Sequence, residues 1–175
     1  TIKFKSNFKK PRQLPLKFLH SKYELVTIHR AEALRSRDTL LKRFEYIKQQ
    51  SETTAKILLL HPHTAKKITK FQIDISDFFT LPPQGYLETQ WLLQNAHHVY
   101  TDSGGLQKEA FFHKIPTTII RSTTEWPETI KCGQNILWKG STKILASNDK
   151  NPFGNGDASI KIAEHLRSYL DNLNL

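Results

Sequence analysis

Residues 98–110 read His-Val-Tyr-Thr-Asp-Ser-Gly-Gly-Leu-Gln-Lys-Glu-Ala. The apolar run at 98–101 predicts a β-strand, the pattern from Leu106 onward predicts a helix, and Asp-Ser-Gly-Gly forms a tight turn between them. Free backbone N–H groups at a helix start, beside two glycines, can hold an anion. Glu109 follows about one and a half helical turns later, where it can meet the ribose of a nucleotide. The stretch predicts a nucleotide-diphosphate site; a glycine-rich turn that binds nothing is the alternative.

Short apolar runs alternate with helical patterns on both sides of this turn. Strands are predicted at residues 25–28, 57–60, 78–81, 98–101, 117–120 and 136–138. Helices are predicted from Asp38, as the N-cap, through Ile47, and at residues 86–96, 106–113, 126–132 and 157–170. This alternation predicts an α/β fold, a Rossmann-like, doubly wound parallel sheet with helices on both faces.

Polar side chains follow five of the predicted strands, at residues 29–32, 61–64, 83–86, 102–105 and 121–125. In a parallel sheet these positions share one rim, which is where such folds bind ligands. His29 and Arg30 can bind phosphate, and His29 can exchange a proton near neutral pH. A locally hydrogen-bonded His29 beside a surface Arg30 is the alternative. Arg121 and Glu125 predict either a substrate-facing loop or an ion pair beside a packed Trp126.

Length and composition restrict the classes of protein that the chain can belong to. A chain of 175 residues can form one domain with a substantial core. No apolar run approaches the roughly 20 residues of a membrane helix, and the N-terminal stretch lacks the apolar centre of a signal peptide. The single cysteine, Cys132, excludes an intrachain disulfide and indicates a reducing compartment, the cytoplasm. The chain contains no methionine, so we interpret it as a piece of a longer product.

The net charge of +10 is concentrated at the N-terminus. Residues 1–22 carry seven lysines and arginines and no acidic residue. We interpret residues 1–22 as a basic leader or interdomain linker and residues 23–175 as one folded domain. A solvated linker explains this charge without a nucleic-acid or membrane partner, so neither is expected.

Neither a metal site nor a cofactor is predicted. His61 and His63 flank Pro62 at a spacing that can bind zinc, but no cysteine or carboxylate follows at a ligand-like spacing. Cys132 is expected to pack rather than react. No Ser-His-Asp order and no pair of carboxylates stands out. These features predict a nucleotide-binding half with an incomplete set of catalytic groups.

Six sequence blocks mark the chain, at residues 26–32, 61–64, 83–87, 101–110, 121–128 and 151–158. The most specific are Thr-Asp-Ser-Gly-Gly-Leu-Gln-Lys-Glu-Ala, the fourth block, and Asn-Pro-Phe-Gly, which opens the sixth. Their types and order resemble the C-terminal half of the non-hydrolysing bacterial UDP-N-acetylglucosamine 2-epimerases, from about Tyr23 to the end of the chain. The resemblance implies one of two Rossmann-like domains in the glycosyltransferase-B arrangement, with UDP bound in the cleft between them.

The resemblance also implies residues that hold a UDP-sugar: Arg30, Gln84, Gly85, Tyr86, Ser103, Gly104, Gly105, Glu109, Arg121 and Glu125. The serine–glycine turn would hold the diphosphate, Glu109 the ribose hydroxyls, and Gln84 with its neighbours the uracil. His29 would be the catalytic residue, approaching the diphosphate and assisting the departure of UDP.

The implied reaction inverts C2 of the sugar. It removes the C2 proton and expels UDP, and then adds both back on the other face. The acids that move the C2 proton belong to the N-terminal domain of the family, which this chain lacks, so the isolated chain is expected to be inactive. The implied partners are the UDP-sugar, that missing domain and a second copy in a homodimer.

Three positions depart from the commonest family pattern: Ala33 replaces an asparagine, Trp126 an arginine and Thr89 an aromatic residue. The Thr-Glu-Trp-Pro-Glu and His-Pro-x-Thr blocks are more similar to a subgroup that acts on UDP-2,3-diacetamido uronic acids. The sugar therefore stays open between this class and UDP-GlcNAc. The alternative functions are a non-catalytic nucleotide-sugar binding module and half of a glycosyltransferase-B transferase.

Overall fold

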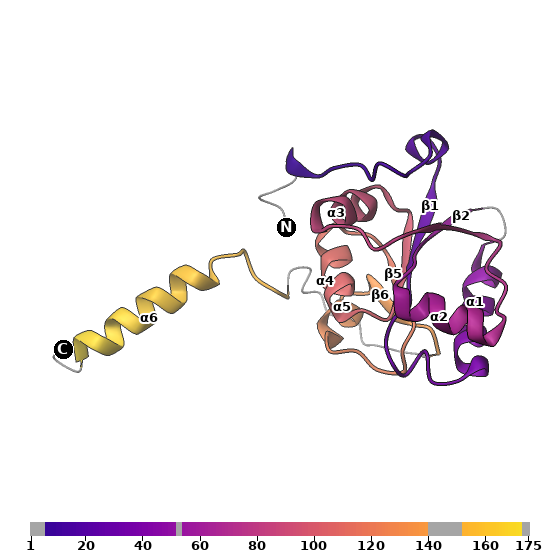
Figure 1. Cartoon of the computed structure of the whole chain (residues 1–175). Coiled ribbons are helices and arrows are strands. Elements are labelled where there is room, and N and C mark those ends of the chain that lie inside the picture. Colours follow the sequence, from indigo (N-terminus) through magenta and orange to yellow (C-terminus); the bar gives the residue numbers. More distant parts are fainter. Residues whose placement is uncertain (1–5, 52–53, 140–151, 173–175) are drawn as a thin grey trace.

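Six parallel strands form the centre of the molecule, in the order β3-β2-β1-β4-β5-β6 (Figure 1). The computed structural model describes residues 6–51, 54–139 and 152–172. Strands β1 to β3 follow one another from the centre of the sheet to one side. Strand β4 then pairs with β1 at the centre, and β5 and β6 follow on the other side. This order is that of a Rossmann-like, doubly wound sheet, as predicted.

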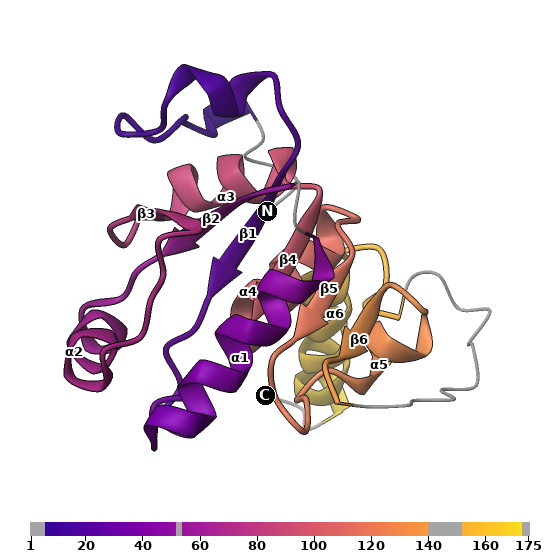
Figure 2. The same cartoon turned by 90° about the vertical axis from the view of Figure 1, so that its right-hand side faces the viewer.

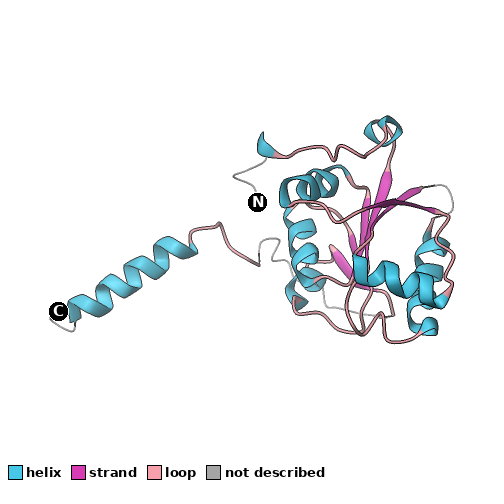
Figure 3. Ribbon diagram, viewed as in Figure 1, coloured by secondary structure: helices cyan, strands magenta, loops and turns pink. Residues whose placement is uncertain are grey.

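The strands lie close to their predicted positions: β1 Tyr23–Thr27, β2 Ala55–Leu59, β3 Phe78–Leu81, β4 His98–Thr101, β5 Thr117–Ile119 and β6 Asn135–Leu137. The helices are α1 Arg37–Gln50, α2 Pro62–Phe71, α3 Tyr86–Asn95, α4 Gly104–Phe112, α5 Pro127–Lys131 and α6 Ala158–Asn172. A short 3₁₀ helix, Leu16–Leu19, precedes β1 (Figure 3). No described helix combines the length and apolar character needed to cross a membrane.

Helices cover both faces of the sheet, with α1 and α2 on one side and α3 and α4 on the other (Figures 1 and 2). Every residue of β1 is buried, including the polar Glu24 and Thr27, as expected for a central strand of a parallel sheet covered on both faces. Alternate residues of β1 face opposite cores: Val26 packs in the α1 core with Phe44, and Leu25 packs in the α3 and α4 core with Leu92. The sheet is therefore rigid at its centre, where β1 and β4 meet.

Two helix starts differ from the prediction. Ser36, not Asp38, is the N-cap of α1, because its Oγ accepts a hydrogen bond from the Thr39 amide at 3.2 Å. Helix α4 begins at Gly104, two residues earlier than predicted, because Ser103 is its N-cap. The sequence pattern also gave no prediction for α2, which begins with Pro62 in its first turn.

At both ends of the chain, the burial of apolar residues differs from what the sequence indicates. The charge of the leader indicates a solvated segment, and the apolar spacing of the last helix indicates a packed face. In the leader, Leu14 and Phe18 are each 3% exposed and pack in the α3 core, so part of this basic segment lies against the domain. Helix α6 forms as predicted but has no buried residue, and it projects away from the sheet (Figure 1). Residues 1–5 and Asn151 lie outside the described residues.

Candidate functional site

The carboxyl ends of β1 and β4 lie side by side at the point where the strand order reverses. Ligands of doubly wound sheets bind in the crevice at this point. Ser103 opens α4 there: its amide donates to Thr101 Oγ1 at 2.9 Å, and its Oγ accepts from the Leu106 amide at 3.4 Å. The turn thus presents the start of α4, where backbone N–H groups and the helix dipole favour an anion.

Asp102 connects this turn to the end of β1. Its carboxylate, which has no exposed surface, accepts hydrogen bonds from the backbone amides of His29 at 2.9 Å and Arg30 at 2.8 Å. It also lies 3.2 Å from Nδ1 of His29. Because the carboxylate is an acceptor, the contact assigns a hydrogen to Nδ1 and leaves Nε2 of the one-third-exposed ring for a ligand. Asp102 therefore fixes both the backbone and the ring orientation of His29.

The predicted site residues Arg30, Arg121 and Glu125 form one ion-pair cluster beside the turn. Glu125 Oε1 lies 2.6 Å from Arg121 Nη1 and 3.7 Å from Arg30 Nη2, and Arg121 Nε donates to Glu32 at 2.8 Å. The hydrogen bond from Arg121 lowers the pKa of Glu125, and the same bond raises the pKa of Arg121. The ion pair between Arg121 and Glu125, one of the two alternatives for this loop, is thus present. Glu125 holds the guanidinium groups of both Arg30 and Arg121 at the rim.

The other oxygen of Glu125 lies at the start of α4. A Cβ added to Gly104 would be only 3.0 Å from Glu125 Oε2 and 3.5 Å from Trp126 Nε1. Gly104 therefore lets the loop at 121–126 approach the helix start closely, as the absence of a side chain permits. The carboxylate places negative charge beside a position that favours anions.

A cavity of about 200 Å³ opens between this turn and α3. It brings together the predicted residues His29, Gln84 and Ser103, and its wall is completed by Thr27, Leu59, His61, Pro83, Thr89 and Leu106. Gly85 and Tyr86 are adjacent in sequence to Gln84, at the start of α3, where Tyr86 is 49% exposed. Gly105 lies next to Gly104 in the first turn of α4.

Glu109 is not among the residues that line this cavity. It lies one turn beyond Leu106 on α4, where Gln90 Nε2 donates to its Oε2 at 2.8 Å. Burial raises the pKa of Glu109, and the hydrogen bond from Gln90 opposes that change. The sequence pattern assigned no role to Gln90 and no specific role to Asp102, which it placed among the polar residues of the rim. Only the placement of Asp102 directly after a strand hinted at one.

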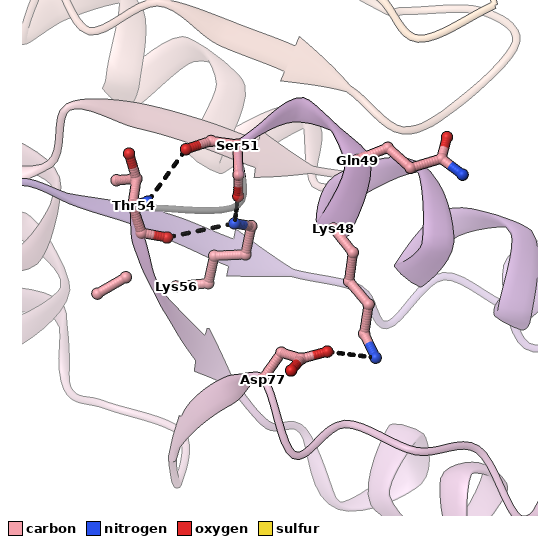
Figure 4. Close-up of a pocket in the computed structure, with 7 residues that line it drawn as sticks. Lys48, Gln49, Ser51, Thr54, Lys56 and Asp77 are labelled. Atoms are coloured by element: carbon pink, nitrogen blue, oxygen red, sulfur yellow. Dashed lines mark hydrogen bonds and ion pairs between the residues drawn. The ribbon is translucent and has the colours of Figure 1, made fainter.

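A larger cavity, of about 450 Å³, lies at the amino ends of the strands, opposite the carboxyl ends that form the candidate site (Figure 4). Its charged groups already have partners: Lys48 pairs with Asp77 at 2.6 Å, and Lys56 donates to the carbonyl oxygens of Ser51 and Thr54. It therefore offers a ligand few groups that are not already bonded. Within residues 6–51, 54–139 and 152–172, no three His, Cys, Asp or Glu side chains gather to hold a metal ion.

Comparison with known proteins shows the family of the chain. The family model for UDP-N-acetylglucosamine 2-epimerase matches residues 2–167. The chain belongs to the UDP-N-acetylglucosamine 2-epimerase family. The resemblance found in the sequence blocks is thus confirmed over nearly the whole chain.

Individual relatives of the family include both sugar classes. A UDP-N-acetylglucosamine 2-epimerase homolog of Methanococcus maripaludis is 38% identical over 94% of this chain and 49% of its own length. The UDP-2,3-diacetamido-2,3-dideoxy-D-glucuronate 2-epimerase of Pseudomonas aeruginosa is 36% identical over 81% of this chain and 43% of its own.

A solved structure is also similar to the chain. The UDP-GlcNAc 2-epimerase of Methanocaldococcus jannaschii, in complex with UDP-GlcNAc and UDP, superposes with a TM-score of 0.75 at 30% identity. That match covers 95% of this chain and 51% of the other chain. The chain thus spans about half the length of the relatives it matches.

Proposed function

We propose that this chain is the UDP-binding half of a UDP-sugar 2-epimerase. The observation that carries the proposal is the start of α4 at the sheet's reversal point, beside a histidine and an arginine whose backbone Asp102 holds. A helix start of this kind favours phosphate, and Arg30 and Arg121 add positive charge. The similarity to a relative solved with UDP-GlcNAc and UDP supports the same ligand here.

Within this proposal each part of the nucleotide has a place. Ser103, Gly104 and Gly105 hold the diphosphate at the start of α4. Gln84, with Gly85 and Tyr86, contacts the uracil in the 200 Å³ cavity, which Gln84 lines. Glu109 accepts hydrogen bonds from the ribose hydroxyls. Glu125 carries the wrong charge for a phosphate contact, so it acts by holding Arg30 and Arg121.

The proposed reaction inverts C2 of the sugar through elimination and re-addition of UDP. Nε2 of His29 faces the diphosphate and assists the departure of UDP, while the contact of Asp102 with Nδ1 holds the ring in that orientation. The groups that remove and return the C2 proton come from the other half of the enzyme. The chain alone therefore binds UDP but does not turn over a UDP-sugar.

Helix α6 supports the other half as a partner. Five of its large apolar residues are about half or more exposed: Ile160, Ile162, Leu166, Tyr169 and Leu170. Because the chain spans about half the length of its relatives, we assign the cover of this face to the N-terminal half of the same enzyme. A homodimer stays a prediction, and the lone cysteine favours the cytoplasm as its location.

Calorimetric titration with UDP tests the proposal. We expect saturable binding that weakens about fivefold in Ser103→Ala, which removes one hydrogen bond, and about tenfold or more in Glu109→Ala, which removes a charged acceptor. His63→Ala, in the exposed first turn of α2, is the control and should bind as the parent does. Equal affinity in all four chains would contradict the assigned site. Turnover of UDP-GlcNAc by this chain alone would contradict its role as a half.

A further inference from the structure

A buried glutamine connects two helices behind the wall of the small cavity. Gln90 on α3 has no exposed surface. Its Nε2 donates to Oε2 of Glu109 at 2.8 Å, and its Oε1 lies 2.8 Å from Nε2 of His113, the residue that ends α4. Both polar ends of the side chain are thus occupied by groups on α4, and α3 and α4 are joined at this level.

The chemistry of the three groups fixes the direction of every hydrogen bond. An ionised carboxylate can only accept, so the amide NH₂ of Gln90 must point to Glu109. The amide oxygen then faces His113, whose Nε2 must carry a hydrogen. The chain of donors runs from His113 through Gln90 to Glu109, and flipping the amide would place two acceptors against each other at Glu109.

The helices that carry this network also line the candidate nucleotide cavity. Thr89, the neighbour of Gln90, and Leu106, one turn before Glu109, both line that cavity. On the opposite side the ring of Phe8 packs edge-on against His113, with ring centroids 5.7 Å apart. The amide of Lys9 donates to Leu87 on α3 at 3.3 Å. The leader thus holds the outer end of the network in place.

We propose that Gln90 and His113 are positioning residues that make Glu109 selective for a ribose with free hydroxyl groups. The inference rests on the proposed function, since it concerns the group assigned to the ribose. Gln90 occupies Oε2 and so turns Oε1 of Glu109 toward the sugar of the nucleotide. Without Gln90 the carboxylate loses the bond that orients it and that favours its charged, accepting form.

The experiment compares two nucleotides in calorimetric titrations of the 175-residue chain: UDP and 2′,3′-dideoxy-UDP, which lacks both ribose hydroxyls. We expect the parent to prefer UDP about tenfold, the value for a hydrogen bond to a charged acceptor. Gln90→Leu should bind both nucleotides with the same weak affinity, because only the hydroxyl contact is lost. His113→Leu leaves Gln90 in place but unpaired at its oxygen, and should give a smaller loss of preference.

Gln134→Leu is the matched control. Gln134 also packs against the end of α4, where its Nε2 donates to the carbonyl oxygens of Phe111 and Ile115, but it has no bond to Glu109. It should keep the full preference for UDP even if the fold loses stability. Carbon-13 titration of the Glu109 carboxyl gives a second readout: in Gln90→Leu its pKa should rise, and in Gln134→Leu it should not.

Three results separate the possible failures. A tenfold preference that survives in Gln90→Leu, with an unchanged pKa of Glu109, overturns the positioning role and leaves the proposed function intact. An equal loss of preference in Gln134→Leu also overturns it, since general damage to α4 would then suffice. A parent chain that binds neither nucleotide overturns the proposed function together with this inference.

Discussion

Polar groups and a cavity are found at both ends of the parallel strands: at the amino ends, called the amino edge, and at the carboxyl ends, called the carboxyl edge. The two edges differ in what those polar groups bond to. At the amino edge, Glu24 and Lys56 face each other on neighbouring strands at 3.5 Å, and the cavity beside them is the larger one, about 450 Å³. At the carboxyl edge the cavity is about 200 Å³, but it lies against a helix start and the ring of His29.

Cavity size alone therefore does not identify a binding site. The charged groups of the amino edge pair with one another inside the protein. They therefore affect the free energy of unfolding and do not attract a ligand. The charges of the carboxyl edge belong to one helix start and to two arginines that share Glu125. The backbone N–H groups of that helix start favour an anion, while Glu32 and Glu125 pair with the two arginines. Stability should therefore depend on the first edge and nucleotide affinity on the second.

The largest expected effect is at the amino edge, in Lys56→Met. Both side chains of the pair are about 5% exposed, and burial raises the pKa of Glu24 while Lys56 opposes that rise. Removing the cation should lower the free energy of unfolding by about 3 kcal/mol, the usual cost of an uncompensated buried charge. Chemical denaturation measures this loss.

UDP affinity should stay unchanged in Lys56→Met, because neither Glu24 nor Lys56 lines the cavity at the candidate site. The double variant Glu24→Leu/Lys56→Met is the control, since it removes both charges and should recover most of the stability. If Lys56→Met weakened UDP binding without lowering the free energy of unfolding, the assignment of stability to the amino edge and affinity to the carboxyl edge would be wrong.

An intermediate effect is expected at the carboxyl edge, in Gly104→Ala. The added methyl group must displace the carboxylate of Glu125, from which it would be 3.0 Å, and it narrows the approach to the helix start. UDP affinity should fall about tenfold, or 1.4 kcal/mol. Alanine is the better helix former, so the free energy of unfolding should not fall. A loss of both quantities would indicate a damaged helix rather than a blocked anion site.

The smallest expected effect is a pH dependence of stability from His98 at the amino edge. Burial, with a smaller contribution from His97, lowers the pKa of His98 to about 4. The unfolded chain takes up a proton near pH 6.5 while the folded chain does not, so stability is lost as the pH falls from 6.5 toward 4. Between pH 7 and 5.5 this loss should be about 1.2 kcal/mol.

Denaturation curves of the parent and His98→Gln at both pH values measure this contribution. The variant removes the ionisable ring and can keep a hydrogen bond to Thr118, which His98 contacts at 2.9 Å. Its stability should change less with pH than that of the parent. His97→Gln, on the exposed neighbouring residue, should retain most of the parent's pH dependence, because burial is the larger cause of the lowered pKa of His98. A pH profile in the His98 variant identical to that of the parent would contradict the assignment.

Most of the fold could be predicted from local signals. Each strand contains a short stretch of apolar or β-branched residues, and the turn at 102–105 combines a capping serine with two glycines, so strand, turn and helix follow from neighbouring residues. The start of α2 was missed because His61-Pro62-His63 carries no strong cap, although His61 Nδ1 accepts a bond from the His63 amide. Ser36 and Asp38 are both residue types that cap helices and lie two positions apart, so the sequence alone did not show that Ser36 is the N-cap of α1.

Long-range contacts account for what the sequence could not predict in the site. Asp102 holds the His29 amide across 73 residues, and Gln90 reaches Glu109 across 19. Neither pairing has a periodicity or a spacing that a single sequence reveals. The residue types indicated the rim, but the orientation of the ring of His29 came only from the packing of β1 against β4.

Local sequence signals were enough for the strands, for every helix except α2 and the short 3₁₀ helix, for the capped glycine turn and for the family, because these depend on residue types within a few positions of one another. Tertiary structure alone decided which charges are paired, which helix start is open and which apolar faces are covered. Leu166 has the same helical spacing as a core residue, yet it is 54% exposed, because burial depends on what lies opposite a side chain in space.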